Sequence, residues 1–192
     1  MSGFAPAIES GRSTFSSAFT SITKLSDADL TRLRRKHIGF VFQFFNLLPM
    51  LSAEENILLP LSIAGEKPEP DWYKDLIQSV GLGDRLHHRP AELSGGQQQR
   101  VAIARALVSR PSVIFADEPT GNLDSKTSGE ILELLRHSVR DLGQTMVMVT
   151  HDARAAQIAD RVLFLADGLI VKESTGATAT EILAAMEELG AE

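Results

Sequence analysis

The chain has 192 residues, a net charge of −6 and a composition of 43% hydrophobic and 23% charged residues, as expected for a globular protein with one core or a core and a small inserted lobe. The acidic balance argues against nucleic acid as a partner, and the absence of cysteine excludes disulfides and cysteine-ligated metal sites. No run approaches the ~18–20 apolar residues of a membrane span, and no secretory signal is apparent, so we expect any membrane association to come through a partner.

Residues 1–24 are rich in Ser and Thr and give no clear element, whereas residues 25–92 are predicted to be mostly helical, with one strand. Ser26 is a candidate N-cap, and Asp29 follows three residues later, as in a weak capping box. Several prolines make the pattern beyond residue 44 irregular. The predicted elements are helices over 25–36, 53–59 and 72–80 and a buried strand over 37–43.

The second part of the chain alternates between helices and strands. A helix that begins near Gln97 must end before Pro111, and Asp167 and Gly168 lie in the turn of a predicted hairpin. The alternation predicts an α/β layer with parallel strands. The predicted elements are helices over 97–110, 126–142, 152–159 and 181–189, strands over 113–116 and 145–150, and a hairpin over 162–165 and 169–171.

The segment LSGGQ at 93–97 opens the helix that begins near Gln97. Gly95 and Gly96 allow a ligand to approach the backbone closely, and Ser94 adds a hydroxyl group. A helix start offers unpaired N–H groups and a partial positive charge, which suits a phosphate. The alternative is structural: Ser94 is an N-cap and the glycines form a tight turn.

Several polar residues follow predicted strands. Asp117 and Glu118 end an apolar strand, where a carboxylate could hold Mg²⁺ and another could orient an attacking water. His151 and Gln43 follow the strands over 145–150 and 37–43, at the same edge of the sheet. Each has a structural alternative: a solvated strand end for the carboxylates and a non-catalytic histidine. The segment at 121–124 alone indicates a turn and a helix cap.

Together, and in this order, these motifs resemble the nucleotide-binding domain of ABC transporters, with a match from about residue 24 to 168. Within that family, VFQFFNLLP at 41–49 and EPTGNLD at 118–124 are similar to the macrolide-export and lipoprotein-release group. ATPases of this group typically serve a membrane permease of the FtsX-like kind.

The resemblance implies an α/β fold: a RecA-like P-loop NTPase core with a mostly parallel sheet, its N-terminal part missing, and an inserted α-helical subdomain. We expect residues 1–43 to be the residual N-terminal part of the core and residues 44–96 to be the helical subdomain, which ends in the signature motif. Residues 97–192 would form the second part of the core, with the hairpin and closing helix.

The resemblance also implies roles in ATP hydrolysis. Gln43 would contact Mg²⁺ and the attacking water, and residues 44–49 would relay that state to the membrane subunit. Asp117 would be the Walker B aspartate on Mg²⁺, Glu118 the catalytic glutamate, and His151 the switch histidine that senses the γ-phosphate. The implied cofactors are ATP and Mg²⁺.

In this family two subunits sandwich two ATP molecules head to tail. The signature motif would therefore bind the γ-phosphate held by a second ATPase subunit, in a homodimer or heterodimer, and a D-loop would lie at the dimer interface. The implied location is cytoplasmic, on the inner face of the cell membrane through the permease. The signature residues are Ser94, Gly95, Gly96 and Gln97, and the D-loop residues are Asn122, Leu123 and Asp124.

The segment PAIESGRST at 6–14 resembles the end of a phosphate loop, G-x-x-x-x-G-K-[ST], and two alignments compete. In one, Gly11, Arg12 and Ser13 replace G-K-S, which puts Pro6, without an N–H donor, at the first glycine and an arginine at the lysine. In the other, residues 10–12 are a later turn before a strand leading to 22–27, and we favour it because it needs little length adjustment. Neither gives an intact Walker A motif.

Several hypotheses follow from this. The chain is an N-terminally incomplete copy of a normal ATPase subunit, or a non-hydrolysing regulatory subunit whose signature motif completes the site of an intact partner, or a non-functional fragment. A soluble ABC ATPase of translation or DNA repair is a further alternative. It is disfavoured because neither tandem cassettes nor a long coiled-coil insertion occurs in this sequence.

Overall fold

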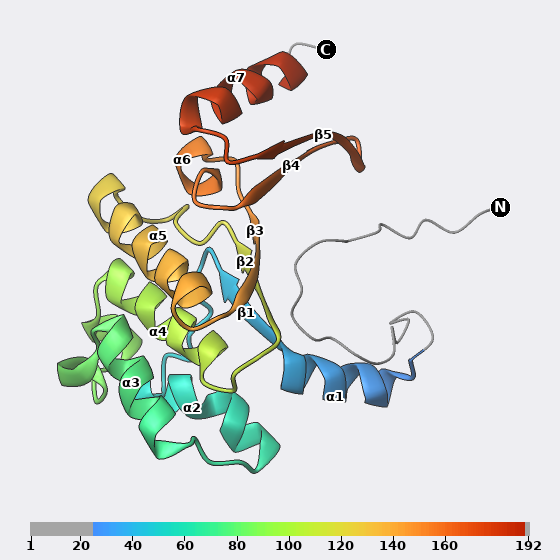
Figure 1. Ribbon diagram of the computed structural model, residues 1–192. Coiled ribbons are helices and arrows are strands. Elements are labelled where there is room, and N and C mark those ends of the chain that lie inside the picture. The colour runs from blue at the N-terminus through green and yellow to red at the C-terminus, as the bar shows by residue number, and fades with distance from the viewer. Residues whose placement is uncertain (1–24, 191–192) are drawn as a thin grey trace.

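The computed structural model describes residues 25–190; the segment at 6–14 and its two alignments lie outside the described residues. Helix α1 (Asp27–His37) comes first (Figure 1). Its predicted N-cap is confirmed, because Ser26 Oγ accepts a hydrogen bond from the Asp29 backbone N–H at 3.3 Å. The helix buries none of its residues and leads directly into the first strand.

Three parallel strands form the central sheet in the order β1–β2–β3: β1 (Ile38–Phe42), β2 (Val113–Asp117) and β3 (Thr145–Val149). Phe42 pairs with Asp117, and Asp117 pairs with Val149, so all three strands end at the same level. The residues that follow the strands therefore meet at one edge, as predicted.

The sheet is covered on one face. Side chains of alternating residues, such as Val41, Ile114 and Ala116, are buried beneath helices. The opposite face carries Phe40, which stacks on Phe115 with ring centroids 5.8 Å apart, and both rings are partly exposed. The prediction of a buried strand over 37–43 is therefore correct for one face of β1 only, because its side chains alternate between the two faces.

A helical lobe follows the first strand: α2 (Ala53–Ala64), α3 (Pro70–Val80) and short 3₁₀ turns at Gly83–Arg85 and Pro90–Glu92. Ser52 and Glu55 form a capping box at the start of α2. The prediction that this helix ends at residue 59 is wrong, because α2 continues through Pro60. Its end is instead set by Gly65, in a left-handed conformation with φ +71°.

Helices α4 (Gly95–Leu107) and α5 (Ser125–Arg140) cover the sheet. Figure 1 shows α4 in the middle of the molecule, with α5 on one side and the helices of the lobe on the other. Helix α4 approaches β1 so closely that a Cβ at Gly39 would lie 2.7 Å from the carbonyl oxygen of Ala106. The main core forms around this helix.

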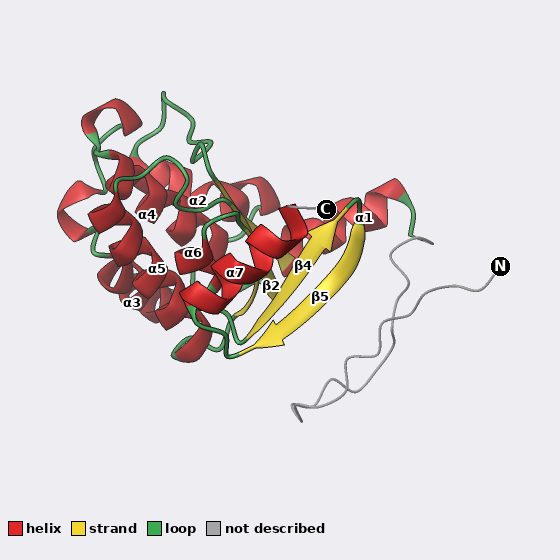
Figure 2. Cartoon of the chain, turned by 90° about the horizontal axis from the view of Figure 1, so that it is seen from above, coloured by secondary structure: helices red, strands yellow, loops and turns green. Residues whose placement is uncertain are grey.

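The C-terminal part forms a second, smaller core. It consists of α6 (Ala153–Ala156), an antiparallel hairpin of β4 (Arg161–Ala166) and β5 (Leu169–Thr175), and α7 (Ala179–Gly190). Asp167 and Gly168 form the hairpin turn with φ of +51° and +77°, which confirms its predicted position. Figure 2 shows α7 lying across the hairpin, where Phe164 packs with Ile182 and Ala185.

Candidate functional site

The loops that follow β1 and β2 meet through Gln43 and Asn122. The Nδ2 atom of Asn122 donates to the backbone carbonyl of Gln43 at 3.1 Å, and Nε2 of Gln43 lies 3.4 Å from Oδ1 of Asn122. A Cβ at Gly121 would come within 2.7 Å of Gln43 Nε2, so the glycine makes room for the glutamine amide. The structure therefore brings together a residue predicted for the catalytic edge and one predicted for the D-loop.

Glu118 leaves the sheet in a left-handed conformation with φ +44°, which is uncommon for a residue with a side chain. Its backbone N–H still donates to Val149 of β3 at 2.9 Å, and its carbonyl accepts from Gly121 at 3.0 Å. The backbone thus turns sharply immediately after the last strand residue. This turn places the carboxylate of Glu118 above the end of β3, beside the residues that follow that strand.

Both oxygens of the Glu118 carboxylate accept hydrogen bonds from the segment after β3. Oε2 accepts from the hydroxyl of Thr150 at 3.0 Å, and Oε1 accepts from the backbone N–H of His151 at 2.9 Å and from its Nδ1 at 2.6 Å. The Glu118 side chain is only 18% exposed, whereas that of His151 is 81% exposed. With Nδ1 turned toward the carboxylate, Nε2 is the histidine nitrogen that can meet a ligand.

Asp117 ends β2 with its side chain exposed on the face opposite the helices. Mg²⁺ prefers hard oxygen ligands, takes one or two carboxylates from a protein and otherwise keeps waters and substrate phosphates. Asp117 offers a carboxylate. Its strand partner is Phe42, and the next residue, Gln43, offers an amide oxygen. Among residues 25–190 no group of three or more His, Cys, Asp or Glu side chains gathers. This donor set fits Mg²⁺ shared with a phosphate ligand.

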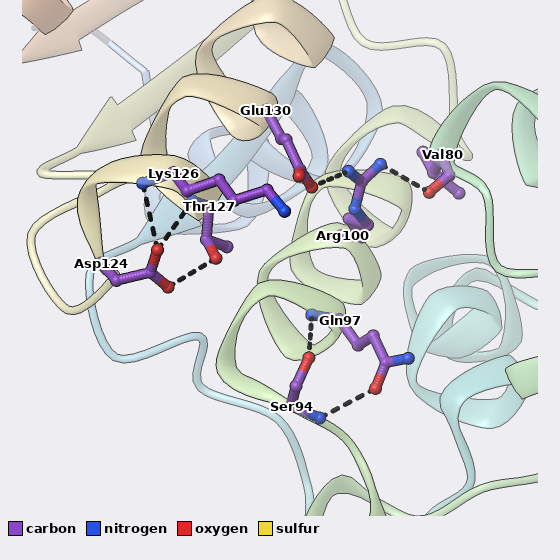
Figure 3. A network of polar contacts seen from close by, with 8 residues as sticks. All are labelled: Val80, Ser94, Gln97, Arg100, Asp124, Lys126, Thr127 and Glu130. Atoms are coloured by element: carbon purple, nitrogen blue, oxygen red, sulfur yellow. Dashed lines mark hydrogen bonds and ion pairs between the residues drawn. The ribbon is translucent and has the colours of Figure 1, made fainter.

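The signature segment forms the N-terminus of α4. Ser94 Oγ accepts from the Gln97 backbone N–H at 3.3 Å, and Gln97 Oε1 accepts from the Ser94 N–H at 2.8 Å. Figure 3 shows this capping box beside the first turn of α5. A Cβ at Gly95 would lie 3.4 Å from Leu123, and one at Gly96 only 2.5 Å from Thr127. The glycines therefore allow the signature turn to pack against the D-loop and the start of α5.

Asp124 caps α5. Its Oδ1 accepts from the backbone N–H groups of Lys126 and Thr127, each at 3.0 Å, and its Oδ2 accepts from the Thr127 hydroxyl at 2.6 Å (Figure 3). These bonds, that of the Thr127 hydroxyl above all, hold the pKa of Asp124 below its usual range. The structural alternative for residues 121–124, a turn and a helix cap, is therefore present at Asp124.

The site divides into two sets of contacts. In the first set, Gln43 is hydrogen-bonded to Asn122 of the loop after β2, and Glu118 of that loop is hydrogen-bonded to His151. In the second set, Ser94 and Gln97 are hydrogen-bonded to each other. No hydrogen bond within residues 25–190 joins the signature side chains to Glu118 or His151. In this chain the signature turn instead touches the D-loop through Gly95 and Leu123.

Two buried amides that support the site were missed by the sequence analysis. Gln99 is fully buried in α4 and donates to the carbonyl of Pro119, next to Glu118. Asn56 is fully buried in α2 and bonds to both backbone groups of Leu48. A signal existed for Gln99, which lies three residues after Gly96 and four before Ile103, on the apolar face of its helix.

Residues 10–121 match the family model of the ABC transporter. The chain belongs to the ABC transporter family. It is 52% identical over 151 residues to an uncharacterized ABC transporter ATP-binding protein of Thermotoga maritima, over 78% of this chain and 64% of that protein. It is 50% identical over 154 residues to the lipoprotein-releasing system ATP-binding protein LolD of Geobacter metallireducens, over 79% and 68% of the two chains.

A third relative in this family is the macrolide export ATP-binding/permease protein MacB of Bdellovibrio bacteriovorus, 49% identical over 149 residues. That match covers 78% of this chain and 23% of the relative. These relatives confirm the predicted resemblance to the macrolide-export and lipoprotein-release group. The chain spans less than two thirds of the Thermotoga relative and less than a quarter of the Bdellovibrio one.

Among solved ABC structures, the dimeric post-hydrolysis state of the ATP-binding cassette MJ0796 bound to ADP and Pi is similar, with a TM-score of 0.69 and 44% identity. The similarity covers 80% of this chain and 69% of that one. It confirms the predicted α/β fold with a parallel sheet of the RecA-like ABC cassette type.

Proposed function

We propose that this chain is the ATP-binding subunit of an ABC transporter and couples ATP binding and hydrolysis to a membrane permease of the FtsX-like type. The observation that carries this proposal is the Glu118 carboxylate, held by Thr150 and His151 at the edge where Gln43 and Asp117 also lie. A fixed, largely buried carboxylate beside the proposed cation site suits the orientation of a water for attack on a phosphate.

We assign Asp117 and Gln43 to Mg²⁺, which when bound would neutralise the charge of the ATP phosphates. Glu118 orients and polarises the attacking water, and the hydrogen bonds from Thr150 and His151 fix the direction of its carboxylate. His151 contacts the γ-phosphate through Nε2, since Nδ1 faces Glu118. This histidine therefore connects the state of the nucleotide to the catalytic carboxylate.

We assign the signature motif to the ATP of a second cassette. Its support is the helix N-terminus itself, which presents backbone N–H groups and positive potential to an anion, together with the packing of Gly95 on Leu123 of the D-loop. Asn122, Leu123 and Asp124 would then lie at the interface between the two cassettes. The residues that meet the γ-phosphate are Ser94, Gly95, Gly96 and Gln97.

We assign residues 44–96 to the α-helical subdomain, and residues 1–43 and 97–192 to the two parts of the core. The permease would contact the loop after Gln43, where Phe44 and Met50 are each 72% exposed. None of the helices within 25–190 has the length and apolar character to cross a membrane. Through the permease, the chain would sit on the cytoplasmic face of the cell membrane.

A second candidate function concerns the phosphate-loop motif that an ABC ATPase needs. The 192 residues contain no G-x-x-x-x-G-K-[ST] motif. In the alternative function the chain is a non-hydrolysing regulatory subunit, and its Ser94–Gln97 segment completes a site whose phosphate loop belongs to an intact cassette. The capping box at Ser94 and the close approach of Gly96 to Thr127 keep the signature turn in shape, as this role and the first one both require.

Mixing experiments separate these functions. Phosphate release from ATP and Mg²⁺ is measured for the chain alone and for the chain mixed with an intact cassette such as the G. metallireducens LolD. The ATPase function is supported if the chain alone hydrolyses ATP and Glu118→Gln abolishes this activity. Glu133→Gln, a change at an exposed position, is the control and should leave the activity unchanged. Activity only in the mixture, sensitive to changes at Ser94, supports the regulatory subunit. Inactivity in both settings contradicts both.

A further inference from the structure

The loop after Gln43 contains two successive residues with a left-handed backbone conformation. Phe45 and Asn46 have φ of +60° and +50°, in the left-handed region that residues with a Cβ rarely adopt. The backbone N–H of Asn46 bonds to the carbonyl of Phe44 only two residues earlier, at 2.5 Å. Two successive residues in this region require support from elsewhere in the fold.

Arg105 of helix α4 supplies that support. Its guanidinium donates from one nitrogen to the carbonyl of Asn46 at 2.6 Å and from the other to the carbonyl of Phe45 at 2.7 Å. The two carbonyls belong to the two residues with positive φ, so the planar fork of the guanidinium matches this particular turn. The side chain holds the backbone of the loop without contacting any of its side-chain polar groups.

The same loop touches the signature turn. A Cβ at Gly95 would lie 3.9 Å from Cζ of Phe45, so the phenylalanine ring extends to the first residue of α4. Residue 105 lies in the last turns of that helix, and side chains of a helix point back toward its N-terminus. Helix α4 therefore contacts the loop twice, at its start through Gly95 and near its end through Arg105.

The far end of the loop is fixed separately. Asn56 of α2 accepts from the backbone N–H of Leu48 at 2.8 Å and donates to its carbonyl at 3.1 Å. The free part of the loop is thus short: it lies between Gln43, held by Asn122, and Leu48, held by Asn56. Within this part, the two bonds from Arg105 decide where the backbone runs.

We propose that Arg105 is a positioning residue that links the signature helix to Gln43 by holding the backbone of Phe45 and Asn46. The proposal rests on the proposed function, in which Gln43 meets Mg²⁺ and the signature turn meets a γ-phosphate. A movement of α4 when its N-terminus binds phosphate would shift these two carbonyls and, through them, Gln43. Arg105 itself touches neither the nucleotide nor the cation.

The surroundings of Arg105 agree with a link to the backbone rather than with an ion pair. No ion pair among residues 25–190 involves Arg105. Its side chain is half-buried, and desolvation lowers the pKa of its guanidinium below the usual range. The two carbonyl oxygens are therefore its structural partners, and a lysine with a single ammonium group cannot span them in the same way.

The absence of cysteine makes a site-specific test direct. A nitroxide label is attached to Phe44→Cys, beside the turn, or to Ile63→Cys, at the end of α2; both positions are exposed. Arg105→Lys is introduced into each full-length labelled chain, and Arg136→Lys, an exposed arginine of α5 that pairs with Glu133, is the matched control. The mobility of the label and the hydrogen exchange of residues 43–51 are recorded, with the urea unfolding midpoint as the check on folding.

We expect Arg105→Lys to mobilise the label at 44 but not at 63, and to speed exchange of residues 43–51 about tenfold, as for the loss of a charge-assisted hydrogen bond. Arg136→Lys should change neither the mobility of the labels nor the exchange rate of residues 43–51. An unchanged label at 44 would overturn the proposal. Equal mobilisation at both positions, or a general loss of stability, would also overturn it, because the arginine would then support the lobe as a whole.

These measurements need no nucleotide, so they decide the role of Arg105 even if the proposed function fails. If the chain alone hydrolyses ATP, a further readout applies, because its own Gln43 then belongs to a working site. Because Arg105 does not touch ATP, Arg105→Lys should lower kcat and leave KM within about twofold of the parent value. A rise in KM with kcat unchanged would instead place the arginine in nucleotide binding and contradict the positioning role.

Discussion

The side chain of Gln99 joins helix α4 to the loop that follows Glu118: its Nε2 donates to the backbone carbonyl of Pro119 at 2.6 Å. Gln99 is fully buried, and Pro119 follows Glu118, the residue with a φ of +44°. Helix α4 thus holds the loop after β2 through Gln99, as it holds the loop after β1 through Arg105. These two side chains make one helix the common support of both loops.

The first prediction concerns this bond. Gln99→Glu replaces a buried donor by a carboxylate that would face a carbonyl oxygen, so the variant must either carry an unpaired charge or take up a proton. We expect a loss of about 3 kcal/mol in the free energy of unfolding. Urea unfolding followed by the fluorescence of Trp72, the single tryptophan, measures it. Gln78→Glu, at an exposed position of α3, should cost under about 0.5 kcal/mol. Equal losses would contradict the assignment.

The second prediction tests the contact between β1 and α4. Gly39→Ala would place a Cβ 2.7 Å from the backbone carbonyl of Ala106, where no rotamer change can relieve the clash. We expect a loss of about 2–3 kcal/mol in the free energy of unfolding. Gly129→Ala is the matched change in open space on α5 and should stabilise the protein by about 0.5–1 kcal/mol. Opposite signs of the two midpoint shifts are the expected result.

The third prediction concerns Asn56, whose amide holds the loop after Gln43 through Leu48. Asn56→Asp keeps the shape of the side chain but removes the donor that bonds to the carbonyls of Leu48, Leu51 and Ser52. Because the side chain is fully buried, we expect a loss of about 3 kcal/mol or more. Asn46→Asp, at an exposed position where the side chain forms no hydrogen bond within residues 25–190, is the control for stability. A tolerated Asn56→Asp would mean that water reaches this site.

The fourth prediction concerns pH. The pKa of Asp124 is lowered in the folded protein by the Thr127 hydroxyl and by backbone N–H groups at the start of α5. A lowered folded pKa gives stability that is fully present above the unfolded pKa of about 3.9 and is lost as the pH falls through the folded value. The stability difference between the parent and Asp124→Asn should therefore be constant from pH 5 to 8 and shrink below about pH 4.

Urea midpoints between pH 3 and 8, with a ¹³C titration of the Asp124 carboxyl group, measure this effect. Asp75→Asn, an exposed aspartate inside α3, is the control at neutral pH and should leave the midpoint nearly unchanged. A difference that grows on acidification would have the wrong sign for a carboxylate stabilised by helix N–H groups.

Local signals in the sequence predicted much of the fold. The N-cap at Ser26 and the hairpin turn at Asp167 and Gly168 depend on short-range chemistry, and both are present. The parallel strands pair over long distances in the chain, but the alternation of strands and helices predicts them. The end of α2 was misjudged because Pro60 lies in a helix that packs against α4, and tertiary packing outweighs the single lost hydrogen bond.

The candidate site was predicted as a set of strand ends, which topology alone brings to one edge. The contact of Glu118 with Thr150 and His151 depends on the left-handed turn at Glu118, and a sequence carries no clear signal for such a turn outside glycine. The supports of the site were missed for a related reason. Gln99 and Arg105 are polar residues in a helix, and only the packed structure shows which backbone carbonyls they reach.

The face of the sheet opposite α4 and α5 carries exposed apolar side chains within residues 25–190, which has a colloidal consequence. Phe40 and Phe115 stack on this face, and Val147 and Val149 of β3 are exposed there at 45% and 60%. Contiguous apolar surface of this kind promotes self-association, whereas the net charge of −6 keeps molecules apart at low salt. The concentration at which the purified chain stays monodisperse should therefore fall as salt screens that repulsion, and Phe40→Lys should raise it.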